Sequence, residues 1–113
     1  MTTYKKKIEW VQNDFGFDIP LRCIDEETGT PVDISGCTVK WRVAEKGAAT
    51  PKFVGGCTIT GDGTAGLCRY TVKAGDFDEP DKTYLTQLIV TKPGYERKFR
   101  GLTIHIEGEL PES

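Results

Sequence analysis

The chain has 113 residues, enough for one domain, residues 1–113, that buries roughly two-thirds of its unfolded surface. Its 13 glycines and 6 prolines, with many β-branched and aromatic residues, favour short strands over helices. The 15 basic and 17 acidic residues are intermixed and no long apolar segment is present, so neither nucleic acid nor a membrane is an expected partner.

The amino terminus has no signal-peptide pattern, because the basic residues 5–7 are not followed by a sustained apolar run. We therefore expect the chain to be made and folded in a cytoplasm. The basic run itself is expected to be a solvated arm, followed by a short strand around Ile8 and Trp10.

Residues 15–23 alternate between apolar and polar side chains, which predicts a half-buried strand. The residues expected to face the core are Phe15, Phe17, Ile19, Leu21 and Cys23. Because Pro20 has no amide hydrogen to donate, this strand is expected either at a sheet edge or with the Pro20 nitrogen facing outward.

The next strand is predicted over residues 38–43, with Val39, Trp41 and Val43 inward and Trp41 at the centre of the core. Residues 44–56 lack this alternation and are rich in glycine and proline, which predicts a loop that contains a short strand around residues 52–54.

A hairpin is predicted around Asp62 and Gly63, a pair typical of a type I′ turn. This turn would place Ile59 opposite Gly66 and Cys57 opposite Cys68.

Two further strands are predicted towards the carboxyl terminus. The residues expected to face inward are Tyr84, Thr86, Leu88, Val90, Leu102, Ile104 and Ile106, and those expected to face outward are Leu85, Gln87, Ile89, Thr103 and His105. Because Phe99 is out of phase with the positions that follow it, Gly101 is predicted to mark a β-bulge.

About seven strands in a chain of this length predict an all-β fold, an immunoglobulin-like antiparallel β-sandwich. Trp41 on a middle strand and Tyr84 at the start of a late one suit that architecture, although no cysteine lies in the late strand to form its inter-sheet disulfide. A small open barrel is the structural alternative.

No metal, cofactor or catalytic residue is predicted. Cys57 and Cys68 could form a disulfide in the hairpin, but reduced thiols are favoured, and the cysteine spacing does not suit zinc. His105 is expected to be an ordinary surface histidine. The acidic residues 25–27 and 76–81 are expected to be solvated turn residues rather than calcium ligands. An enzyme is therefore the least supported class.

Residues 10–36 carry a pattern of known type: Trp10-Val11-Gln12, Asp14-Phe15, an alternating strand, an acidic turn, and Gly29-x-Pro31-Val32-Asp33-Ile34-Ser35-Gly36. This pattern resembles the amino-terminal domain of the baseplate upper protein of tailed bacteriophages, and short phage and prophage tail proteins built on the same sandwich. Residues 66–70, Tyr84 and residues 101–106 extend the resemblance over nearly the whole chain.

The resemblance implies a structural virion protein, usually present in several copies per particle, that docks onto other tail or baseplate proteins. A homo-oligomer is a second form of assembly to be expected. The chain ends at Ser113, without the long distal regions of the baseplate protein, so either a small adaptor or a shortened form of the longer protein is expected rather than a host-recognition protein. The candidate protein interface is the outer face of the sheet that contains Trp41. Its residues are Arg42, Leu85, Gln87, Ile89, Thr103 and His105. The alternative is an ordinary surface on which Leu85 and Ile89 are scattered exposed apolar residues.

The alternative function is an immunoglobulin-like adhesion or carbohydrate-binding module of a bacterial surface protein. Sugar-binding sandwiches expose aromatic side chains. The candidates for such a platform are Trp10, Phe77 and Tyr95.

Overall fold

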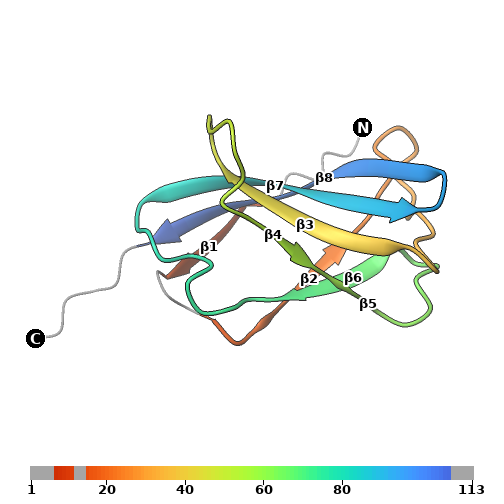
Figure 1. Ribbon diagram of the computed structural model, residues 1–113, viewed down its shortest axis with the longest axis horizontal. Helices are drawn as coiled ribbons and strands as arrows, with labels where there is room; N and C mark the ends of the chain where they lie inside the picture. The colour runs from red at the N-terminus through yellow and green to blue at the C-terminus, as the bar shows by residue number, and fades with distance from the viewer. Residues whose placement is uncertain (1–6, 12–14, 108–113) are drawn as a thin grey trace, which may run out of the picture.

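The computed structural model describes residues 7–11 and 15–107, which form strands and loops without a helix (Figure 1). The strands are β1 (Lys7–Val11), β2 (Asp18–Arg22), β3 (Thr38–Glu45), β4 (Phe53–Gly56), β5 (Thr58–Ile59), β6 (Leu67–Thr71), β7 (Lys82–Lys92) and β8 (Tyr95–Glu107). They form a five-stranded sheet in the order β1-β8-β7-β3-β4 and a three-stranded sheet in the order β2-β6-β5. The prediction of an all-β sandwich is confirmed.

The strand order is that of an immunoglobulin-like sandwich, with β8 and β7 beside the strand that contains Trp41. The described pairs are antiparallel except for β1, which runs parallel to β8. β1 covers only the second half of β8, from Thr103 to Glu107. The short strand predicted inside the loop after β3 is present as β4, and it lies at the edge of the larger sheet.

The core lies between the two sheets, and Trp41 is at its centre with 0% of its surface exposed. Its ring centroid is 5.1 Å from that of Tyr70 on β6, 6.1 Å from that of Phe53 on β4 and 6.3 Å from that of Phe77. Burial of each side chain of this size contributes roughly 1.5–3 kcal/mol. The predicted core position of Trp41 is confirmed.

The alternation predicted over residues 15–23 is only partly correct. Ile19, Leu21 and Cys23 are buried and Phe17 is half-buried, but Phe15 is 61% exposed. Gly16 has a φ of 84°, so the extended backbone is interrupted before β2 begins, and Phe15 lies outside the sandwich. Pro20 is exposed on β2, which is an edge strand as predicted.

The predicted type I′ turn at Asp62 and Gly63 is wrong. Ile59 lies opposite Cys68, and Thr58 lies opposite Arg69. A type I′ turn needs positive φ at both central residues, but among the described non-glycine residues only Asp81 has a positive φ. The carboxylate of Asp62 instead accepts hydrogen bonds from the Thr64 N–H and hydroxyl, which close a longer loop.

The predicted bulge at Gly101 is confirmed by a shift in the pairing of β7 with β8: Leu85 lies opposite Thr103, whereas Gln87 lies opposite Arg100. A Cβ at residue 101 would be 2.4 Å from Oγ1 of Thr86. Glycine therefore allows the buried Thr86 to approach β8, where its hydroxyl donates to the Leu102 carbonyl at 2.6 Å.

Candidate protein-binding surface

The candidate surface is the outer face of the larger sheet, on the side opposite the core. Three rows of cross-strand neighbours run over it from β3 through β7 to β8: Lys40, Ile89, Lys98; Arg42, Gln87, Arg100; and Ala44, Leu85, Thr103. Regular pleating places alternate residues of each strand on this side. We refer to these nine residues as the outer face.

Five of the six residues predicted as an interface belong to these rows, and the sixth, His105, lies next to them at the end of the sheet. It is opposite Thr83, whose Oγ1 is 3.1 Å from His105 Nδ1. The structure therefore brings all six predicted residues onto one side of the sheet.

The two aliphatic residues expected to be exposed differ in burial. Leu85 is 48% exposed, but Ile89 is only 8% exposed, so its predicted exposure is wrong. Ile89 lies between Lys40 and Lys98, whose long alkyl chains can cover it, whereas Leu85 lies between the smaller Ala44 and Thr103.

Two cationic residues of the outer face were not included in the sequence prediction. Lys40 follows the same alternation as Arg42 and could have been found from it. Lys98 was obscured by the bulge at Gly101, which changes the phase of β8 between its two halves. Shifting the alternation by one residue before Gly101 would have assigned Lys98 to this side.

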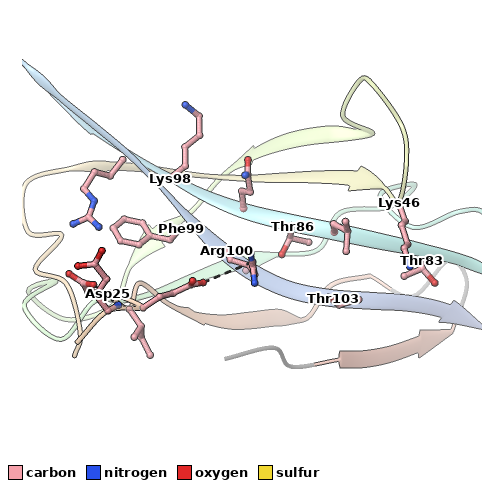
Figure 2. A pocket seen from close by; sticks show the side chains of 15 residues that line it. Asp25, Lys46, Thr83, Thr86, Lys98, Phe99, Arg100 and Thr103 are labelled. Atoms are coloured by element: carbon pink, nitrogen blue, oxygen red, sulfur yellow. Dashed lines mark hydrogen bonds and ion pairs between the residues drawn. The ribbon is translucent and has the colours of Figure 1, made fainter. Parts of the chain in front are cut away.

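The cations of the outer face differ in their partners. Lys98 Nζ is 3.2 Å from a carboxylate oxygen of Glu96. Arg100 turns towards Glu26, with 4.0 Å between Arg100 Nε and a Glu26 carboxylate oxygen (Figure 2). Lys40 and Arg42, by contrast, form no ion pair with any residue that the structure describes, and the buried Nε of Arg42 has no hydrogen-bond acceptor there.

An open groove with a volume of about 930 Å³ runs along β7 and β8 (Figure 2). Leu85, Gln87 and Thr103 from the predicted interface line it, as do Lys46 and residues 24–27. Its lining mixes cations, acids and hydroxyl groups. Within residues 7–11 and 15–107, no group of three histidine, cysteine or acidic residues is arranged to hold a metal ion.

The acidic residues after β6 support the fold. Asp76 accepts hydrogen bonds from the Tyr70 hydroxyl at 2.6 Å and from the Lys73 N–H at 2.8 Å. Asp78 pairs with Lys52 at 2.8 Å, and this ion pair lowers the pKa of Asp78. These contacts give the carboxylates structural partners within the chain.

The four cysteines are free thiols, and three of them are in contact. Cys68 hydrogen-bonds with both Cys23 and Cys57. The bond with Cys23 favours the Cys68 thiolate, but the bond with Cys57 and burial outweigh it and raise the pKa of Cys68 to about 12. The hydrogen bond with Cys68 and burial also raise the pKa of Cys23 well above its usual range.

The predicted pairing of Cys57 with Cys68 is wrong, because Cys68 lies opposite Ile59. Cys57 is diagonal to Cys68 across the hairpin. Diagonal positions have Cα atoms about 7–8 Å apart, beyond the usual range for a disulfide.

The aromatic residues proposed as a sugar-binding platform do not lie together on the surface. Phe77 is 1% exposed and packs against Trp41, so its predicted exposure is wrong. Tyr95 is half-buried beneath Lys92, whose Nζ is 5.2 Å from the ring centroid. The side chain of Trp10 lies outside the described part of the structure.

In comparisons with protein-family models and with curated proteins, no family model and no curated sequence matches this chain. In the part of the chain that the structure describes, no helix has the length and apolar character to cross a membrane.

Proposed function

We propose that the protein is a structural component of a phage or prophage tail or baseplate, and that it docks onto other virion proteins through the outer face of its larger sheet. The observation that carries the proposal is the partly apolar, cation-bearing outer face, where Leu85 is 48% exposed. The resemblance of residues 10–36 to baseplate proteins supports the virion assignment. The proposal takes Leu85 as the apolar contact and the cations of the outer face as the polar rim of the interface.

We also propose that the protein has no catalytic role. Burial and hydrogen bonding keep Cys23 and Cys68 protonated at neutral pH, although nucleophilic catalysis requires a thiolate. His105 contacts the Thr83 hydroxyl, and Asp78 is paired with Lys52. These polar groups have structural partners rather than the mutual arrangement of nucleophile, base and orienting residue.

Fractionation of the source bacterium after phage induction tests the virion assignment. The chain is expected to sediment with purified tail or phage particles on a density gradient and to be detected there by mass spectrometry. Its absence from particles, with recovery in the cell-surface fraction, would contradict the proposal and favour the adhesion module.

A Leu85→Glu variant tests the docking surface in the same particles. Since Leu85 is exposed, the substitution should leave folding intact but reduce incorporation into particles. Thr58→Glu adds the same charge at an exposed position of the smaller sheet and should be incorporated normally. Equal incorporation of both variants would exclude Leu85 from the interface.

A further inference from the structure

We infer that the outer face binds an acidic, extended segment of a partner protein, with carboxylates on Lys40 and Arg42 and an apolar side chain on Leu85. This inference rests on the proposed docking function and adds the chemistry of the partner. Its first support is the charge of this face, because four of its nine residues are cations: Lys40, Arg42, Lys98 and Arg100.

On the outer face the acidic partners are missing for the two cations of β3. Neither Lys40 nor Arg42 has an acid within ion-pair distance among the described residues, although the chain as a whole has a net charge of −2. The cations thus form a local positive area on a weakly acidic protein. Such an area attracts and orients a partner of opposite charge.

The second support is the guanidinium of Arg42. Its Nε is excluded from solvent and forms no hydrogen bond in the described part of the molecule, whereas the residue as a whole is only half-buried. Because the chain itself covers Nε, a partner would reach Arg42 through the terminal guanidinium nitrogens. A carboxylate accepts hydrogen bonds from an arginine side chain through two oxygens, so it is the group that best matches the arginine.

The spacing of these groups fits an extended segment. Lys40 and Arg42 are two residues apart on β3, which separates them by roughly 7 Å along the strand. Acidic residues at alternate positions of an extended chain have the same spacing. Leu85 lies on the neighbouring strand β7, so an apolar side chain of the segment can contact it while the carboxylates remain on β3.

The composition of the outer face favours a protein over a nucleic acid. Its centre on β7 consists of Leu85, Gln87 and Ile89, and none of its nine residues is aromatic. Single-stranded nucleic acids are usually bound by aromatic residues on which the bases stack. Glu96 and Glu26 already pair with Lys98 and Arg100, so the cations without acidic partners are confined to β3, which suits a short acidic segment better than a continuous phosphate backbone.

Fluorescence anisotropy with synthetic probes tests this inference. The probe is a labelled peptide with glutamate and valine at alternate positions, measured at low and high salt beside its glutamine counterpart and an oligodeoxythymidylate of equal charge. The glutamate peptide should bind the wild-type chain and lose affinity in salt. A Lys40→Gln/Arg42→Gln variant should bind it about five- to tenfold more weakly.

The matched control is Arg69→Gln/Lys73→Gln, which also removes two positive charges, but at positions outside the outer face. It should change the affinity less than twofold, on the order of experimental error. Thermal unfolding of both variants verifies that they are folded. Equal loss in both variants, equal binding of the glutamine peptide, failure of the glutamate peptide to bind, or tighter binding of the oligonucleotide would each overturn the inference. Presence of the chain in phage particles would still support the virion role in any of those cases. Failure of the acidic-segment inference can therefore be distinguished from failure of the proposed function.

Discussion

The aromatic ring of Tyr70 on β6 lies directly against the backbone of Gly55 on β4, so a Cβ at residue 55 would be 2.2 Å from Tyr70 Cε1. The contact joins the two sheets beside Trp41, whose ring centroid is 5.1 Å from that of Tyr70. Glycine is thus required at residue 55 by space rather than by backbone conformation.

We expect Gly55→Ala to lower the free energy of unfolding by about 1–3 kcal/mol, because the tyrosine ring must move within a packed core. The neighbouring Gly56→Ala is the matched control, since a Cβ there would meet nothing within 4 Å. Urea denaturation of both variants measures the difference. Similar stability for the two would show that Tyr70 does not pack on Gly55.

The hydroxyl of Tyr70 is the subject of a second prediction. It donates to Asp76 at 2.6 Å, and this bond ties β6 to the loop that follows it. Tyr70→Phe should cost roughly 1–3 kcal/mol in unfolding free energy, as expected for a partly buried hydrogen bond to a carboxylate. Tyr95→Phe removes a hydroxyl without a hydrogen-bond partner among the described residues and should be nearly neutral. A neutral Tyr70→Phe variant would argue against the bond.

A third prediction concerns the bulge. Thr86→Val keeps the shape of the side chain but removes the donor to the Leu102 carbonyl, so it should destabilise the fold by about 1–3 kcal/mol. Thr91→Val is the control, because its hydroxyl lies 3.5 Å from the Thr38 carbonyl at an exposed position. Calorimetric unfolding compares the two. Equal losses would contradict a special role for Thr86.

Acid should destabilise the protein through its turn carboxylates. Hydrogen bonds from the Ser35 hydroxyl and N–H lower the pKa of Asp33, and those from the Thr64 N–H and hydroxyl lower the pKa of Asp62. A pKa that is lower in the folded state gives stability above the unfolded value of about 3.9, and this stability is lost as the pH falls through the folded value.

Unfolding free energies measured by urea between neutral pH and the acid range check this effect. The Asp33→Asn/Asp62→Asn variant should lose less stability in acid than the wild type. Glu27→Gln, at an exposed carboxylate that accepts no hydrogen bond from the described residues, serves as control. An unchanged pH dependence in the double variant would exclude these two turns as its source.

The thiols should differ in reactivity. Cys23 and Cys68 are buried and have raised pKa values, whereas Cys37 and Cys57 are half-buried. Iodoacetamide should therefore label Cys37 and Cys57 first in the native protein and all four cysteines after unfolding without reductant. A pair that remains unlabelled after unfolding would reveal a disulfide. Faster labelling of Cys68 than of Cys37 would contradict the burial described above.

Period-two alternation predicted the strands with long, unbroken patterns and their inward residues. Trp41 and Tyr84 are both buried as expected from it. Alternation failed where a neighbour rather than the residue itself decides exposure. Ile89 is 8% exposed and has a lysine opposite it on each neighbouring strand, and the identity of cross-strand neighbours depends on register, which a single sequence does not give.

The errors at the hairpin and on β8 also arise because a local sequence pattern does not give the register between strands. Asp62 and Gly63 match the residues of a two-residue turn, but the hydrogen bonds between Asp62 and Thr64 stabilise a longer loop. The Gly63 carbonyl also accepts the N–H of Ile34, a contact that depends on the tertiary fold. On β8 the predicted bulge at Gly101 reverses the side on which the residues before it lie, so the alternation of the residues after it does not predict the position of Lys98.

The partial coverage of β8 by β1 has a consequence for how copies of the chain meet. In the described structure the half of β8 before Gly101 has no strand on its second side, and it presents Glu96, Arg97 and Lys98 in succession and, after the buried Phe99, Arg100. Closely spaced charged side chains on an unpaired strand edge disfavour hydrogen-bonded pairing with the same strand of another molecule. Copies of the chain at high concentration should therefore resist pairing with one another through this half of β8.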